Sequence, residues 1–372
     1  MKIERIDVYA VRGPRREAVR SGTTGATPVT ASEFGVIRLV TADGCEGLGE
    51  ISITYPRIGF TLCHAARRLI VPRLLGQDAT RLPELLALID TILAGELSAP
   101  YLRAAFEIAL LDWTGRQHGV PVWRLLGGKA RERVPLAWGI YQNPPDEMAR
   151  AAEEGLAAGF HAIKLKVGRA LADDVAAVRA VAAAIGPGIP LRLDANQAWT
   201  SVPAASHAMR ALAAEARVAW FEQPLARTNL QGMRLLRQQA IAPVMADESL
   251  QTLHDAYEVA RAEAADVFNV YICEAGGIQA AAQIFAFAAA LGIPCILGSQ
   301  AEMGIGTAAA AHLGVAVPNL TEAWETFGPL RYVKELVRPA TRIEHGYLHP
   351  AGGPGLGVTL DEDVLAEWTV GE

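Results

Sequence analysis

Short apolar runs alternate with Ala-rich, helix-forming segments over the last two thirds of the chain. From Val134 onward there are eight candidate strands, at residues 134–140, 161–167, 190–194, 218–222, 243–247, 266–271, 293–298 and 319–325. From the second run onward they start 23 to 29 residues apart, which is typical of successive βα units. The pattern predicts an α/β fold with an eight-unit (β/α) barrel. An open doubly wound sheet is less favoured, because no G-x-G-x-x-G turn follows the first run.

The first 130 residues have a different pattern of apolar and polar residues. Apolar and polar residues alternate from Ile3 to Val8 and from Val36 to Thr41, and Asp43-Gly44 is a turn signal. This alternation predicts an antiparallel sheet. Residues 60–127 then predict amphipathic helices that end at a Gly-Gly pair. We therefore expect an N-terminal α+β domain. The tail from residue 343 contains no further βα unit, and we expect it to pack back on that domain.

A segment rich in Arg, Gly, Thr and Pro separates the first two predicted strands, from Val11 to Ser32. A loop of this length inside a compact domain is usually a lid or a binding loop. Its arginines, Arg15, Arg16 and Arg20, would then meet an anionic substrate. A solvated basic loop is the alternative interpretation.

Composition narrows the class of protein. The 372 residues are 51% hydrophobic, which supports a large packed core. A formal charge of −6 with mixed signs offers no basic face, so we expect no nucleic-acid partner. The charged N-terminus lacks an apolar signal core, and the most apolar stretch is interrupted by Gly292 and Pro294. We expect a cytoplasmic protein without membrane contact.

Three of the predicted strands end on a carboxylate, namely Asp194, Glu222 and Asp247. The carboxyl ends of neighbouring parallel strands lie together at one edge of a sheet, so the three acids should converge. Unpaired acids at such distances repel one another. A hard divalent cation with oxygen ligands would relieve that repulsion, and Mg²⁺ is the usual occupant, with Mn²⁺ as an alternative.

Two lysines lie on one face of the second barrel strand. Lys164 and Lys166 alternate with Ile163, Leu165 and Val167, and the apolar face should meet the helices. The lysines then point into the barrel mouth, where an unpaired lysine is rare. We expect burial and mutual repulsion to lower the pKa of at least one of them, which would suit a general base. Salt bridges to Asp194 or Glu222 are the structural alternative.

Further polar residues follow other strands, where barrel enzymes place substrate contacts. Ser299, Gln300 and Glu302 follow the seventh strand and Tyr141 follows the first. Helix capping is the competing interpretation for Ser299 and Glu302. Near the sixth strand, Glu274 is expected either to donate a proton, to pair with Lys164, or to be an ordinary surface acid.

These motifs resemble the enolase superfamily, muconate-lactonizing-enzyme subgroup. The resemblance rests on Lys164-Leu-Lys166, Asp194-Ala-Asn196, Glu222-Gln-Pro, Asp247-Glu-Ser and Gly276-Gly277-Ile. It implies an N-terminal capping domain (1–130) with a substrate-specificity loop. It further implies a modified (β/α)8 TIM-type barrel (131–345) and a C-terminal segment (346–372) that packs on the cap.

The resemblance also implies roles for individual residues. Mg²⁺ would be held by Asp194, Glu222 and Asp247. Lys166 would act as the acid/base, steered by Lys164, on a small carboxylate substrate. Asn196 and Arg20 would contact that substrate. The protein would assemble into dimers or octamers.

One departure from the family pattern bears on the reaction. The family usually carries a second lysine five residues before the Gly-Gly pair, and Tyr271 occupies that position here. A tyrosine is a poor base at neutral pH. We therefore expect Lys166 to work alone through a metal-stabilised enediolate, in muconate-cycloisomerase-like chemistry or syn β-elimination, with Tyr271 as a substrate contact. A racemase or epimerase of amino acid derivatives or dipeptides, and a non-catalytic binding protein, are the alternatives.

Overall fold

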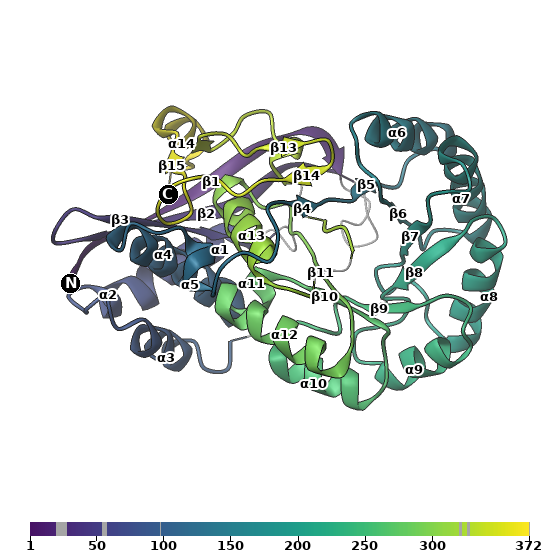
Figure 1. Ribbon diagram of the computed structural model, residues 1–372, viewed down its shortest axis with the longest axis horizontal. Coiled ribbons are helices and arrows are strands. Elements are labelled where there is room, and N and C mark those ends of the chain that lie inside the picture. The colour runs from purple at the N-terminus through teal and green to yellow at the C-terminus, as the bar shows by residue number, and fades with distance from the viewer. Residues whose placement is uncertain (20–27, 54–57, 97, 320–321, 326–327, 372) are drawn as a thin grey trace.

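A curled parallel sheet forms the centre of the molecule (Figure 1). The computed structural model describes residues 1–19, 28–53, 58–96, 98–319, 322–325 and 328–371. Seven strands in the order β11-β10-β9-β8-β7-β6-β5 form the sheet. They are β5 (Trp138–Ile140), β6 (Ile163–Lys166), β7 (Leu191–Asp194), β8 (Val218–Glu222), β9 (Val244–Ala246), β10 (Val267–Val270) and β11 (Cys295–Leu297). This arrangement confirms the predicted barrel-type α/β fold.

Helices cover the outer face of this sheet (Figure 1). They are α6 (Pro145–Ala157), α7 (Leu171–Ile185), α8 (Val202–Ala213), α9 (Leu230–Gln238), α10 (Leu253–Arg261), α12 (Ile278–Leu291) and α13 (Gly304–Ala316). Each buries an apolar stripe against the strands; in α9 it includes Met233 and Leu236. N-terminal capping residues mark the start of some of these helices. Thr252 and Asp255 form a capping box at the start of α10.

The barrel closes through a very short eighth segment. We expected a strand at 319–325, but among its described residues the backbone pairing is an isolated parallel bridge between Trp324 and Leu136. The Trp324 N–H donates to the Pro135 carbonyl at 2.8 Å, and the Glu325 N–H donates to the Leu297 carbonyl at 3.1 Å. These bonds place the segment between β11 and the residues that lead into β5.

The predicted first barrel strand is also divided. The segment expected as one strand at 134–140 contains β4 (Val134–Pro135) and β5. Strand β4 leaves the barrel sheet and pairs with β14 (Tyr347–Leu348), which in turn pairs with β13 (Ile343–Glu344). The division therefore attaches the start of the barrel to the C-terminal part of the chain.

The N-terminal domain is an antiparallel sheet with helices, as predicted. Strands β1 (Ile3–Val19), β2 (Val29–Thr41) and β3 (Glu46–Ile51) pair in that order. The helical part follows, with α1 (Gly59–Ala65), a π-helical turn (Ala66–Ile70), α2 (Val71–Leu74), α3 (Leu82–Ile92), α4 (Ala99–Gln117) and α5 (Val122–Leu125).

The prediction of a loop from Val11 to Ser32 is wrong for its described parts. Strand β1 continues to Val19, and Val11 pairs with Phe34 and Pro14 with Ala31. The Arg and Pro content suggested a loop, but alternate side chains of this stretch, such as Val11 and Arg15, are buried. The long hairpin therefore carries Arg15 inward, whereas Arg16 is exposed. Arg20 lies outside the described residues.

The C-terminal segment lies against the first domain (Figure 1). It contains β15 (Thr359–Leu360) and α14 (Glu362–Trp368). A 3-10 turn (Gly328–Arg331) and β12 (Val337–Arg338), which pairs with β15, precede it. Thr369 forms a bridge with Val11, and the Val370 N–H donates to the Ala10 carbonyl at 2.8 Å. The boundaries at residues 130 and 345 stay a prediction. Among the described residues, no helix is long and apolar enough to cross a membrane.

Two buried carboxylates of the N-terminal domain bind backbone N–H groups elsewhere in the chain. Glu50, at the end of β3, accepts from the N–H groups of Met303 at 2.8 Å and Gly306 at 2.9 Å, at the start of α13. Asp112, in α4, accepts from Leu48 at 2.8 Å and from Leu356 at 2.7 Å. A carboxylate at a helix N-terminus satisfies N–H groups that have no partner within the helix. The Glu50 bonds therefore tie the N-terminal domain to α13, and the Asp112 bonds tie α4 to β3 and to the C-terminal segment.

A third buried carboxylate explains the Gly-Gly pair before α12. Glu107 of α4 accepts from the Gln279 N–H at 3.1 Å. A Cβ on Gly277 would lie 1.8 Å from the Glu107 Oε2 atom, and Gly277 has φ of +136°. Only glycine tolerates both conditions. The motif therefore seats α4 against the first turn of α12.

Candidate active site

Three carboxylates meet at the mouth of the barrel. Asp194 ends β7, Glu222 ends β8 and Asp247 follows β9. One ligand atom from each lies within 4.8 Å of the others, and all three side chains are buried. Burial has the largest effect on the pKa of Glu222 and of Asp247 and raises it, and neighbouring acids raise it further.

The chemistry of this group fits a divalent cation. The Oε2 atom of Glu222 is buried and accepts no hydrogen bond from any described residue. A buried carboxylate oxygen without a donor is costly. A hard cation with oxygen ligands satisfies such an atom and offsets the crowded negative charge. The acids predicted from the strand ends therefore form one group that could bind a metal.

Lys164 lies among these acids. Its Nζ atom is 2.7 Å from Glu222 Oε1, 2.6 Å from Glu325 Oε2 and 3.0 Å from Asp194 Oδ2. Burial lowers the pKa of Lys164, but the carboxylates outweigh burial and the net shift is upward. Glu325 lies in the predicted eighth strand, at 319–325, but was not predicted as a site residue. Its position is fixed by the short barrel closure.

Lys166 extends further toward the cavity. Its Nζ atom lies 2.5 Å from Asp194 Oδ2, and its side chain is 20% exposed. We expected burial and lysine–lysine repulsion to lower a lysine pKa. Both effects act on Lys166, but Asp194 and Glu222 raise its pKa above the ordinary value. That expectation is therefore wrong in this structure, because the acids and lysines pair directly. A cation on the acids would weaken this pairing.

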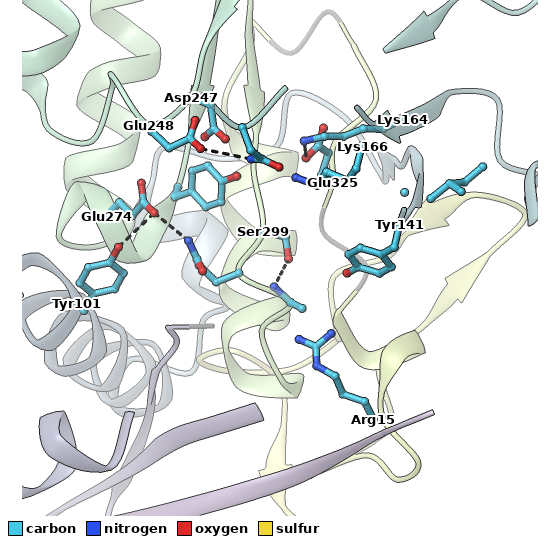
Figure 2. A pocket seen from close by; sticks show the side chains of 16 residues that line it. Arg15, Tyr101, Tyr141, Lys164, Lys166, Asp247, Glu248, Glu274, Ser299 and Glu325 are labelled. Atoms are coloured by element: carbon cyan, nitrogen blue, oxygen red, sulfur yellow. Dashed lines mark hydrogen bonds and ion pairs between the residues drawn. The ribbon is translucent and has the colours of Figure 1, made fainter. Parts of the chain in front are cut away.

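A cavity of about 230 Å³ opens above these groups (Figure 2). It brings together most of the predicted site residues: Tyr141, Lys164, Lys166, Asn196, Asp247, Tyr271, Ser299 and Gln300. Asp194 and Glu222 do not line it. Arg15 and Glu274, for which the sequence left alternatives open, also line the cavity. Three further polar lining residues, Tyr101, Glu248 and Glu325, were not predicted from the sequence. Figure 2 shows the lysines and Glu325 on one side, and Glu274 with Tyr101 on the other.

The segment after β11 forms one wall of the cavity. Ser299 and Gln300 line the cavity, whereas Glu302 lies behind them and borders a separate small pocket with Glu50. The Ser299 hydroxyl donates to the Glu302 carboxylate, and the Gln300 N–H donates to Glu302 Oε1 at 3.0 Å. Glu302 thus shapes this wall instead of lining it. The capping interpretation does not apply to α13 itself, which Glu50 caps.

Two tyrosines face the cavity from different strands. Tyr271 follows β10, and its ring tip packs so closely on Gly298 that a Cβ there would lie 2.3 Å from Cζ. Burial raises the pKa of Tyr271 most, and the nearby Asp247 raises it further. The Tyr271 hydroxyl therefore stays protonated at neutral pH. Tyr141 differs, because Arg331, Arg15 and Lys166 outweigh burial and lower its pKa.

Glu274 has neutral partners. Its Oε1 atom accepts from Gln300 Nε2 at 2.8 Å and from the Tyr101 hydroxyl at 3.2 Å. The expected pairing with Lys164 is not made; Glu325 holds that lysine. With only 7% of its surface exposed, Glu274 is not an ordinary surface acid.

Fold and site together define a class. A barrel with a cap, a buried carboxylate group at the strand ends and two lysines beside it is typical of enzymes that use a divalent cation and a lysine for proton transfer.

Comparison with known families agrees with this class. Residues 147–364 match the family model described as enolase C-terminal domain-like. Residues 6–127 match the N-terminal domain of mandelate racemase / muconate lactonizing enzyme. The chain therefore belongs to this family of the enolase superfamily, and it is an enzyme, which confirms the resemblance.

Individual relatives span nearly the whole chain. It is 36% identical to muconate cycloisomerase 1-2 of Acinetobacter lwoffii, covering 98% of this chain and 94% of that protein. It is 31% identical to the L-Ala-D/L-Glu epimerase of Bacillus subtilis, covering 96% and 97%. A crystal structure of muconate lactonizing enzyme from Pseudomonas fluorescens superimposes with a TM-score of 0.91 at 33% identity, covering 99% of both chains.

Proposed function

We propose that this enzyme removes the proton α to the carboxylate of a small substrate, with Lys166 as the base. Asp194, Glu222 and Asp247 would hold Mg²⁺, or Mn²⁺ in its place. When bound, the cation supplies positive charge that offsets the negative charge developing on the substrate carboxylate. The observation that carries the proposal is Lys166 Nζ at the cavity wall, directly beside the carboxylate group.

Lys166 would act alone on one face of the substrate. Lys164 is held by three carboxylates, so it orients the site instead of exchanging protons. Tyr271 keeps its proton at neutral pH because its pKa is raised. A single base suits cycloisomerisation of the muconate type or syn β-elimination, in which the proton moves on one face.

Racemisation or epimerisation is the second candidate. Tyr271 lines the same cavity as Lys166, and a group on a second wall would be needed to return the proton on the opposite face. Similarity to the L-Ala-D/L-Glu epimerase supports this candidate. Here Tyr271 would be the proton donor, with an amino acid derivative or dipeptide as substrate.

The proposal also covers substrate contacts, domain boundaries and assembly. Arg20, Asn196, Tyr141, Ser299 and Gln300 are proposed substrate contacts, with Glu302 acting through Ser299 and Gln300. We further propose a cap at 1–130, a barrel at 131–345 and a C-terminal segment at 346–372. A cytoplasmic dimer or octamer is the proposed assembly.

Proton exchange in D₂O tests the proposal. The Mg²⁺-loaded enzyme is incubated with muconates, succinylbenzoate-like acids, N-acylated amino acids, dipeptides and proline derivatives, and NMR follows the α-proton. The expected result is exchange or product from one substrate class, abolished in Lys166→Ala. Product with single-face exchange supports the one-base reaction, whereas inversion at the α-carbon supports epimerisation. Exchange that persists in Lys166→Ala contradicts the proposal.

A further inference from the structure

One wall of the cavity is acidic and carries no cationic side chain. Glu248 and Glu274 both line it, and neither forms a salt bridge with any residue in the described ranges. Figure 2 shows Glu274 and Tyr101 opposite the lysines, with Glu248 near Asp247. A buried carboxylate normally has a cationic partner or several donors. This wall therefore presents two carboxylates that form no salt bridge with a cationic side chain of the described residues.

The contacts of the two acids reinforce this point. Glu274 is 7% exposed, and its donors, Tyr101, Gln300 and Gln251, are all uncharged. Burial raises the pKa of Glu274 to about 7, and a nearby positive charge would favour its ionised form. Glu248 Oε1 accepts a hydrogen bond from Asn196 Nδ2 at 3.3 Å. The Glu248 Oε2 atom is buried and accepts no hydrogen bond from the part of the chain that the structure describes. The wall thus offers an unsatisfied acceptor in addition to its charge.

The lysines that line the cavity pair with carboxylates outside this wall. Lys164 pairs with Asp194, Glu222 and Glu325, and Lys166 pairs with Asp194. A second substrate carboxylate placed at Glu248 and Glu274 would be repelled, whereas a positive charge would be attracted.

Aromatic rings complete the wall. Tyr101 and Tyr271 both line the cavity together with Glu274. Ring faces attract cations through their quadrupole, and they do so more strongly when the site is shielded from water. Carboxylates flanked by tyrosines are therefore suited to a protonated nitrogen and poorly suited to an anion.

We propose that the wall formed by Tyr101, Glu248, Tyr271 and Glu274 binds a protonated amine of the substrate. The substrate is then an amino or imino carboxylate, with its carboxylate at the metal-binding group and its nitrogen at this wall. The inference rests on the proposed function and narrows it. It favours β-elimination or epimerisation of an amine-bearing acid over cycloisomerisation of a muconate dianion.

Binding of matched pairs tests the inference independently of turnover. Isothermal titration of the Mg²⁺-loaded full-length enzyme compares L-proline with tetrahydrofuran-2-carboxylate, and 5-aminopentanoate with hexanoate; cis,cis-muconate is added as a dianion. The amine member of at least one pair is expected to bind about 10-fold more tightly than its isostere. Equal binding within both pairs, including undetectable binding of both amines, overturns the inference, as does preference for muconate.

Variants of the two wall acids test whether the preference for amines arises at this wall. Glu274→Gln is expected to remove most of the amine preference while leaving the affinity for the neutral isostere within about 2-fold. Glu248→Gln is a second variant should Glu274→Gln fold poorly, which thermal melting would reveal. Glu84→Gln, an exposed acid in α3, is the matched control and keeps the preference. An unchanged preference in both wall variants overturns the inference.

Proton exchange on the same samples separates the two proposals. If Lys166-dependent exchange occurs with the isosteres or muconate and no amine preference exists, the proposed function stands and the inference fails. If amines bind preferentially but no probe exchanges its α-proton, the amine site stands and the proposed function loses its support.

Discussion

Two sets of buried carboxylates in this protein have different partners. At the domain interface, Glu50 and Asp112 accept hydrogen bonds from backbone N–H groups on both sides of the junction. At the barrel mouth, Glu222 retains a buried oxygen without a donor, and the charged partners are lysines. Both sets are buried.

The contrast shows that burial alone does not mark a functional acid. The interface acids are satisfied by the fold and stabilise it. Burial is the main cause of the raised pKa of Glu222 and Asp247. The crowding of the barrel-mouth acids raises it further. Such an arrangement costs stability and persists where a ligand completes it. Substitutions should therefore affect the two sets in opposite ways.

The largest expected effect is the loss of activity in Asp247→Asn. Removing one anionic ligand weakens Mg²⁺ binding, and turnover should fall about 1,000-fold or more. The free energy of unfolding without Mg²⁺ should change by less than about 1 kcal/mol, because a crowded buried charge is removed. Titration calorimetry with Mg²⁺ and chemical denaturation measure the two quantities. Intact activity with intact metal binding would refute the assignment.

A large loss of stability is expected for Gly277→Ala at the interface. The new Cβ would lie 1.8 Å from Glu107 Oε2 at a backbone φ of +136°. The free energy of unfolding should fall by about 3 kcal/mol or more. Gly292→Ala is the matched control, since Gly292 has φ of +70° and nothing within 4 Å of a Cβ. It should cost about 1 kcal/mol. Equal losses in denaturant unfolding would show that the Glu107 contact is unimportant.

Glu50→Gln should lower stability while sparing the affinity for Mg²⁺. The amide nitrogen of Gln cannot accept the Gly306 N–H, and an unsatisfied buried donor costs about 1–3 kcal/mol. Burial raises the pKa of Glu50 to about 7 from 4.5. Its folded pKa exceeds its unfolded pKa, so the native state holds the proton more tightly. The stability that this group contributes is present below pH 4.5 and is lost as the pH rises through 7.

The stability difference between wild type and Glu50→Gln should therefore be largest near pH 5. It should shrink by about 1–3 kcal/mol toward pH 8. Urea unfolding of both proteins across this range measures it. A difference that grows with pH would contradict the raised pKa.

The smallest expected effect concerns Tyr271→Phe. If Lys166 acts alone, loss of the hydroxyl removes one weak hydrogen bond from Asn269 at 3.4 Å, and turnover should fall by less than about 10-fold. If Tyr271 returns a proton, inversion at the α-carbon should fall by about 100-fold or more. NMR of substrate inversion and exchange in D₂O distinguishes the two outcomes.

Periodicity predicted the barrel and its strand-end acids well, because each βα unit carries its own signal. The eighth segment was mistaken for a full strand, because a single bridge at Trp324 leaves no strand-length pattern. Arg15 was placed in a loop because its neighbours are polar, although hairpin pairing with β2 decides its direction. Glu248 and Tyr101 were missed since their role depends on which elements meet across the cavity. Lys166 was found and a salt bridge to Asp194 was the stated alternative, but the sequence could not show that this pairing outweighs the effect of burial on the lysine pKa.

The bonds from Glu50 to the first turn of α13 have a consequence for how such enzymes diverge. That turn immediately follows Ser299 and Gln300, so the cap helps to shape the cavity wall from behind. A chimera joining this barrel to another cap would keep the wall in place only if the foreign third strand presented an acceptor at the same point. Cap and barrel are thus constrained to be inherited together, even though the carboxylate group and lysines lie in one and Arg15 and Tyr101 in the other.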